Sequence, residues 1–192
     1  DSPTHKYQIV TGKELSRHTV TKRRYFDLDD VEIFGGTKRP SKHQESPKLL
    51  VRKTGNIILC SIDDKGTFAE QSVYLVLLRN KDFSIEFLDG FLNSKLVTFY
   101  FQNELITNPE SYPYLQHYDL ENILVPVLKA EKQKLLTKLV KKILAITREK
   151  NYRGSSSKQI KLMKYEKQID QMVYRLYGLT PEEIGVVEKN TK

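Results

Sequence analysis

Short apolar runs of strand length mark the first half of the chain. Residues 7–11 predict a β-strand that a glycine ends. Residues 49–51 and 57–62 favour β-structure and flank the turn-forming residues 54–56, so together they predict a β-hairpin. Residues 73–78 are apolar on both faces, which is typical of a strand in the middle of a sheet.

Polar and turn-forming segments separate these runs. Residues 13–46 are polar and contain two glycines and a proline, so we expect irregular structure there. Residues 63–66 predict a second turn, and residues 103–118 predict a loop rich in asparagine, proline and tyrosine. Residues 123–127 are apolar but include a proline, which lacks a donor for the ladder, and they therefore predict an edge strand.

Apolar residues at helical spacing dominate the rest of the chain. A helix is expected to begin at Ser84, a good N-cap, and to continue to Phe99. Two further stripes, at 135–146 and 162–176, are separated by a Gly/Ser loop and predict two helices that pair antiparallel. A glycine is expected to end the second of them, and the Thr-Pro-Glu-Glu that follows predicts a short capped helix.

The order of these elements predicts the fold class and the domains. We expect a mixed α/β (α+β) domain over residues 1–128, followed over residues 129–192 by a long-helix pair with a terminal capped helix. The helices would pack on the domain or act as a spacer. The chain starts at Asp1 within a few residues of a strand-like run, and we expect it to be a fragment of a longer protein.

Positive charge is concentrated rather than spread evenly. The chain carries 32 Lys and Arg against 24 Asp and Glu, a net charge of +8. Residues 129–167 hold 13 of these cations and only 3 of the acids. A basic helix face of this kind fits nucleic acid, an acidic partner or simply a solvated surface.

Composition narrows the setting in which the chain works. No apolar run approaches the ~20 residues of a membrane span and no signal peptide is visible, so we expect no membrane partner. The single cysteine, Cys60, excludes an internal disulfide and is compatible with a cytoplasmic protein.

Catalytic signals are weak. The sequence has no glycine-rich nucleotide motif, no Asn/Asp-Pro-Pro-Tyr/Phe tetrapeptide and no metal-ligand spacing among its four histidines. Asp63-Asp64-Lys65 loosely echoes a metal-dependent nuclease site, although its composition is better explained by a turn. His117 could serve as a general base, but a surface histidine in a polar loop explains it better. We therefore expect neither catalytic nor metal-binding residues.

The end of the predicted hairpin strand carries the most promising cluster. Arg52 can bind guanine O6/N7 or a phosphate through two parallel hydrogen bonds. Lys53 is a point charge suited to phosphate, and the Thr54 hydroxyl with the neighbouring glycine N–H could complete an anion contact. Gln71 can read adenine N6/N7 and Ser72 either base class. Both segments could equally be ordinary turns.

Taken in order, five segments resemble the TaqI-like C-terminal specificity domains of adenine-N6 DNA methyltransferases and type IIG restriction–modification enzymes, which are related to type I specificity subunits. The segments are VTGKEL at 10–15, PKLLVRKTG at 47–55, QSVY at 71–74, LNSKL at 92–96 and EKQIDQMVYRLYGLT at 166–180. Each is weak alone, but the ordered set spans nearly the whole chain. Residues 35–46 and 103–117 match no family pattern.

The resemblance implies a division of labour. A target-recognition domain of this family lies against the DNA major groove and gives sequence choice to a catalytic domain. That catalytic domain, N-terminal in the same parent chain or in a separate subunit, flips the target adenine and takes a methyl group from S-adenosylmethionine. A parent that also cleaves DNA would add Mg²⁺. This chain would itself be non-catalytic and hold no cofactor, and its partner would be double-stranded DNA.

Two sets of residues follow as candidate DNA contacts. The expected backbone contacts are Lys38, Arg39, Lys42, Arg52, Lys53 and Thr54, and the base-side candidates are Gln71, Ser72 and Tyr74. One rival hypothesis is a protein-interaction module that acts through the basic helical hairpin. A weaker rival is a metal-dependent nuclease built on Asp63 and Lys65, and RNA in place of DNA is a variant of the main reading.

Overall fold

The computed structural model describes residues 6–30, 37–106 and 113–191. The predicted hairpin is confirmed, because β5 (Lys48–Arg52) pairs antiparallel with β6 (Cys60–Asp63) in the register Lys48↔Asp63. The third strand, β8 (Val73–Val76), pairs antiparallel with the other side of β5. β8 is therefore an edge strand and β5 is central, which corrects the prediction. The apolar side chains of β8 pack on both faces of the sheet. Packing on both faces does not depend on whether a strand is central or at the edge of the ladder.

Two smaller sheets flank this one within the described residues. β1 (Tyr7–Val10) lies between β4 (Arg24–Phe26), antiparallel to it, and β7 (Phe68–Ala69), parallel to it. β2 (Leu15–Ser16) and β3 (Thr19–Val20) form a two-stranded pair. The strand expected over residues 7–11 is thus confirmed.

The segment predicted to be irregular, residues 13–46, contains the short strands β2, β3 and β4 and three short helical turns. The turns are η1 (Gly12–Glu14), η2 (Leu28–Asp30) and α1 (Pro40–Gln44). Elements of two to five residues are too short to produce a readable periodicity, so the prediction was wrong here. Residues 31–36 of this segment and residues 107–112 of the predicted loop lie outside the described residues.

The helix expected from Ser84 begins as predicted but ends early. α2 (Ile85–Leu92) starts with the Ser84 hydroxyl accepting a hydrogen bond from the Phe87 N–H at 3.1 Å. It stops at Asn93, whose buried side chain accepts from the Cys60 N–H at 3.1 Å and donates to the Cys60 carbonyl at 3.0 Å. A new helix, α3 (Lys95–Tyr100), then begins and runs into the single π-turn η3 (Phe101–Leu105). Asn93, whose side chain bonds the backbone of Cys60 in β6, therefore divides the predicted helix in two.

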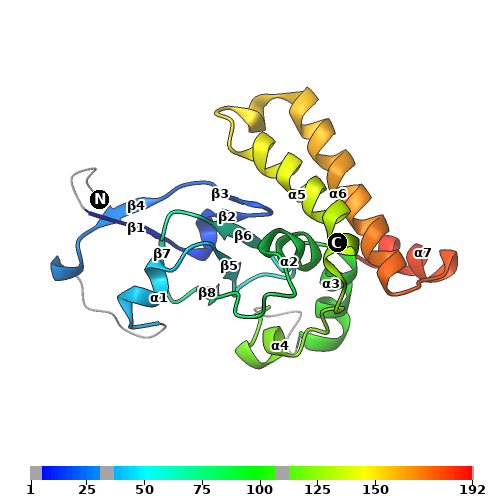
Figure 1. Ribbon diagram of the computed structural model, residues 1–192, viewed down its shortest axis with the longest axis horizontal. Coiled ribbons are helices and arrows are strands. Elements are labelled where there is room, and N and C mark those ends of the chain that lie inside the picture. The colour runs from blue at the N-terminus through cyan, green and yellow to red at the C-terminus, as the bar shows by residue number, and fades with distance from the viewer. Residues whose placement is uncertain (1–5, 31–36, 107–112, 192) are drawn as a thin grey trace.

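The helical hairpin is confirmed. α5 (Ala130–Thr147) and α6 (Ser156–Leu176) run antiparallel and project away from the sheets, joined by the short turn η4 (Tyr152–Gly154) (Figure 1). Gly178 ends α6 with φ +67°, and the Leu179 N–H returns to the Tyr174 carbonyl at 3.1 Å. α7 (Pro181–Asn190) follows behind the predicted Thr180 capping box.

The edge strand predicted over residues 123–127 does not form. No strand is assigned there, and the described chain offers the segment no ladder partner. Ile123 is buried against the core, Leu124 and Val127 are exposed, and the Leu124 carbonyl accepts a hydrogen bond from the Tyr177 hydroxyl. The apolar pattern serves packing between helices, which single-sequence periodicity does not separate from strand pairing.

One hydrophobic core joins the sheet to the helices. Leu49 and Val51 of β5, Phe87 of α2, Val140 of α5 and Val173 of α6 belong to the same buried cluster. α2 lies between the central sheet and the hairpin (Figure 1). The predicted fold class, mixed α/β with a C-terminal helical segment, is confirmed. The division at residue 128 stays a prediction.

Candidate nucleic-acid interface

The end of β5 and the start of β8 place the predicted site residues side by side. Arg52 is opposite Val73 in the ladder, and the Lys53 N–H donates to the Ser72 carbonyl at 3.0 Å. The turn that holds Gln71 therefore lies beside both cations. The sequence separates these segments by about twenty residues, and the antiparallel register brings them together.

Arg52 lies in a slot between two glycines. A β-carbon on Gly55 would come within 2.5 Å of Nη2 of Arg52, and one on Gly12 would lie 3.0 Å from its Cγ. Gly55 also has φ +118°, a conformation that side chains disfavour. Gly12 therefore lies against the aliphatic stem of Arg52, and Gly55 lies against its guanidinium.

The Arg52 guanidinium has no counter-ion in the described part of the chain. Its Nε is buried without a hydrogen-bond partner, and no described carboxylate forms an ion pair with it. Burial lowers the pKa of this guanidinium from its usual value. An unpartnered buried donor costs free energy, and Nε itself is covered. Arg52 as a whole is only half-buried, so a ligand would meet the part of its side chain that stays accessible.

The 70–72 turn shows which side chains are free and which are engaged. The Ser72 hydroxyl donates to Glu70 at 2.5 Å and accepts from the Gly12 N–H at 2.9 Å, so it ties the start of η1 to the turn. Gln71 is exposed, and its side chain makes no hydrogen bond within the described residues. The geometry therefore leaves Gln71 available to a ligand, whereas Ser72 is occupied in fixing the turn.

Lys53, Thr54 and Tyr74 fasten a second loop to the site. The Lys53 ammonium lies 4.3 Å from the centre of the Tyr74 ring, and the Tyr74 hydroxyl donates to the Leu115 carbonyl at 3.1 Å. Burial raises the pKa of Tyr74 above its ordinary value. Thr54 forms an isolated bridge with Tyr114. The described end of the 103–118 loop is thus part of the site, a link for which the sequence contains no local signal.

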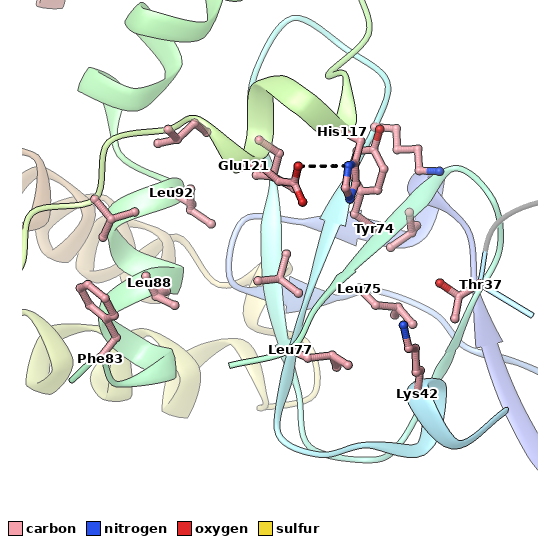
Figure 2. A pocket seen from close by; sticks show the side chains of 16 residues that line it. Thr37, Lys42, Tyr74, Leu75, Leu77, Phe83, Leu88, Leu92, His117 and Glu121 are labelled. Atoms are coloured by element: carbon pink, nitrogen blue, oxygen red, sulfur yellow. Dashed lines mark ion pairs between the residues drawn. The ribbon is translucent and has the colours of Figure 1, made fainter. Parts of the chain in front are cut away.

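A groove of about 640 Å³ follows the outer edge of β8. Figure 2 shows Lys42 and Thr37 on one side of β8, and Leu88 and Leu92 of α2 with Phe83, which precedes that helix, on the other. Lys53, Tyr74 and His117 also line the groove. The structure therefore brings three of the predicted residues, Lys42, Lys53 and Tyr74, to one surface depression.

The segment that carries the cations around α1 is fixed by His43, which was not among the predicted site residues. Lys38, Arg39 and Lys42 are all exposed. His43 is buried, stacks on Phe68 at a centroid distance of 4.7 Å, donates from Nε2 to the Thr37 carbonyl at 2.7 Å and accepts at Nδ1 from the Ala69 N–H at 3.1 Å. Burial lowers the pKa of His43, which favours this neutral tautomer. A neutral anchor therefore fixes the basic segment on β7.

Asp63, the centre of the nuclease hypothesis, is a buried structural carboxylate. Its oxygens accept from the Lys48 ammonium at 2.6 Å, from the N–H and hydroxyl of Thr67 at 2.7 and 2.6 Å, and from Arg23 at 3.3 Å. Burial alone would raise the pKa of Asp63, but the hydrogen bonds from Lys48 and Thr67 outweigh it and the pKa is lowered. These contacts saturate the carboxylate. Nothing observed supports the nuclease alternative.

The loop ends of this α/β domain carry cations beside an amide that makes no hydrogen bond within the described residues. This arrangement is typical of a domain that recognises an anionic ligand. Residues 7–127 match the family model of the TaqI-like C-terminal specificity domain, and the chain belongs to that family. The family has a DNA-specificity role in restriction–modification enzymes and is non-catalytic. None of the curated proteins searched matches the chain.

The family match has a clear structural extent. It runs from β1 to the segment just before α5, so it leaves out α5, α6 and α7. A DNA-recognition domain implies DNA as a partner and a catalytic domain that it serves. In the described ranges, every helix is too short or too polar to cross a membrane.

Proposed function

We propose that this chain is the target-recognition part of an adenine-N6 DNA methyltransferase or of a fused restriction–methylation enzyme. It holds double-stranded DNA with the loops at the end of β5 and around α1. The observation that carries the proposal is the Arg52 slot: an arginine side chain between Gly12 and Gly55, without a counter-ion among the described residues, beside Lys53 and the free amide of Gln71. This is the chemistry of phosphate and base-edge contacts.

The proposed contacts divide into two kinds. Cations at loop ends neutralise phosphates and set the register of the domain on the duplex. Arg52 can instead grip guanine or a phosphate through its planar fork, and Gln71 can pair with adenine N6/N7. Ser72 and Tyr74 contribute by holding the turn and the 113–118 loop in place. The proposed phosphate contacts are Lys38, Arg39, Lys42, Lys53 and Thr54.

The chemistry belongs to a separate catalytic domain of the parent enzyme. That domain would bind S-adenosylmethionine and transfer its methyl group to the target adenine, with Mg²⁺ added if the parent also cuts. We place this activity in the cytoplasm, where the DNA is. The family membership supports this proposal, since specificity domains of this kind supply sequence choice to restriction–modification enzymes.

Salt dependence of duplex binding tests the proposal. Each phosphate contact adds about 0.9 to the slope of log affinity against log salt. The double variant Arg52→Ala/Lys53→Ala should therefore lower the slope by up to about 1.8 relative to wild type. The measurement is fluorescence anisotropy with a labelled duplex at several salt concentrations.

The matched control removes two exposed lysines from α5, Lys134→Ala/Lys138→Ala, and should leave the slope unchanged. Thermal melting of each variant checks that it folds. An unchanged slope in the Arg52/Lys53 variant would remove these two residues from the interface. Failure of the wild-type chain to bind any duplex in dilute salt would sink the proposal as a whole.

A further inference from the structure

A second polar cleft lies where the tip of the helical hairpin meets the β2–β3 pair. Its volume is about 480 Å³, and it is lined by residues 19–21 on one side and by Thr147, Glu149 and residues 151–154 on the other. Arg153 Nη2 donates to the Ser16 hydroxyl at 3.0 Å, which fastens the tip to β2. This cleft lies against helices that the family match does not cover.

The charges around this cleft are unbalanced. The nearby acids are already paired: Glu149 lies 2.5 Å from Lys158, and Asp64 lies 2.5 Å from Arg148. Lys150 is exposed and has no ion-pair partner in the part of the chain that the structure describes. We define the hairpin-tip patch by the lining residues Arg153, Thr19, Thr21 and Asn151, together with Lys22 and Lys150, two exposed lysines that adjoin lining residues in the sequence.

A short path of direct contacts connects the hairpin-tip patch to the Arg52 slot. Arg52 lies against Gly12, which begins η1. The carbonyl of Glu14, at the end of η1, accepts the Thr21 N–H at 2.8 Å and the Thr21 hydroxyl at 3.0 Å. Thr21 lines the cleft together with Arg153. These contacts join the patch to the segment that packs on Arg52.

The chemistry of the hairpin-tip patch favours a phosphate backbone over a protein surface. Lysine, arginine, threonine and asparagine are the side chains that contact phosphate oxygens without reading bases. A protein interface of useful strength has an apolar, aromatic-rich centre. Here the apolar lining is confined to Val20 and Tyr152, and Tyr152 is covered by Arg153 at 5.8 Å from its ring centre.

We propose that the hairpin-tip patch is a second phosphate-contact site, through which the C-terminal helices extend the footprint on DNA beyond the family domain. This inference rests on the proposed function and assigns a ligand to helices that the family match leaves without one. Of the like charges gathered at 129–167, Lys150 and Arg153 would then have a partner.

The experiment compares salt slopes and footprints of the full chain. The double variant Lys150→Ala/Arg153→Ala should lower the log–log slope by up to about 1.8, at about 0.9 per phosphate. Hydroxyl-radical footprinting should show protection lost at one outer edge of the site and kept at its centre. Lys134→Ala/Lys138→Ala removes the same charge from α5 and should change neither readout.

Two further variants separate contact from folding. Arg153→Lys keeps the charge but cannot form the same fork, and it should keep the slope. Lys22→Ala/Lys150→Ala touches only exposed side chains, so it tests the patch even if loss of Arg153 loosens the hairpin. A lowered slope in this folded variant supports the proposal.

The outcomes that overturn the inference differ from those that overturn the proposed function. An unchanged slope and footprint in both tip variants, with a lowered slope in Arg52→Ala/Lys53→Ala, defeats the tip site alone. An equal fall in the Lys134/Lys138 control also defeats it, because the effect would then come from net charge. A wild-type chain that binds no duplex, or binds an acidic protein at the tip instead, defeats the assignment to DNA.

Discussion

At the scale of single residues, the site depends on what two glycines lack. Gly12 and Gly55 let backbone approach the Arg52 side chain closer than any β-carbon would permit. A guanidinium confined in this way has already lost much of its rotamer freedom before it meets a ligand. The slot therefore gives a confined cation beside Lys53, whose ammonium lies over the Tyr74 ring.

His43 fixes the position of the basic segment before and within α1. Because its ring is buried and neutral, with one nitrogen donating and the other accepting, protonation would break the contact with the Ala69 N–H. The described groups that face it include Lys48, whose charge further lowers the pKa of His43. Protonation of His43 should therefore loosen the segment that carries Lys38, Arg39 and Lys42.

The stability of the domain should fall in mild acid because of His43. Its folded pKa lies below the ordinary 6.5, so the unfolded chain takes up the proton first as the pH falls. The contribution of His43 to the free energy of unfolding is complete above about pH 6.5 and declines below it. Urea unfolding at pH 7.5, 6.5 and 5.5 should show this decline in wild type and a weaker one in His43→Gln. His117→Gln, at an exposed histidine, should keep the wild-type decline; a decline of wild-type size in His43→Gln would refute the assignment.

At the scale of elements, α2 and α5 pack closely against each other. A β-carbon on Gly90 of α2 would lie 2.5 Å from Cδ2 of Leu136 and 2.8 Å from Cγ2 of Val140. Gln133 secures the same junction, since its side chain accepts from the Ser84 N–H at 3.1 Å and donates to the Leu128 carbonyl at 2.9 Å. The hairpin is thus fixed to the helix that packs on the sheet.

Two helical glycines provide a matched test of this junction. Gly90→Ala should destabilise the chain by about 1–3 kcal/mol, because an added methyl group overpacks a filled interface. Gly185→Ala in α7 meets nothing within 4 Å and should instead stabilise by up to about 1 kcal/mol, because alanine favours the helix. Denaturant midpoints of both variants measure the difference. Equal effects of the two substitutions would show that α2 and α5 are not packed as described.

At the scale of the whole molecule, the α/β part and the helices share one core. Leu49, Phe91, Leu136 and Ile169 come from four different elements and belong to a single buried cluster. Burial of apolar surface is the main favourable contribution to folding, so each part depends on the other for its stability. Division into two sequence segments does not imply two independent folding units.

A truncated chain of residues 1–128 should therefore fail to fold cooperatively. Loss of α5 and α6 would expose Phe87, Phe91 and the neighbouring face of α2 to water. We expect one sigmoidal urea transition for the full chain, and a shallow transition or aggregation for the truncated one. Well-dispersed amide signals and a steep transition in residues 1–128 would contradict the shared core and favour two separate domains.

The elements that depend on neighbours in sequence were predictable. The Ser84 and Thr180 caps, the β5–β6 hairpin and the antiparallel α5–α6 pair follow from residues within one turn or one strand of each other. The cluster of Arg52 and Lys53 could be found in the same way, since Arg52 ends β5 and Lys53 follows it. Local propensity and periodicity carry this information because hydrogen bonds and caps form between near neighbours.

Distant contacts decided the rest. Four features depend on contacts between segments that are far apart in the sequence, and no local pattern marks them. They are the edge position of β8, the break at Asn93, the burial of Asp63 and the contact of Gly12 with Arg52. By itself, the sequence determined which residues can carry charge to a duplex and the helical or extended form of most segments around them. Only the tertiary structure decided which of those side chains are free and which are consumed, because an internal hydrogen bond to a distant partner removes a group from any ligand.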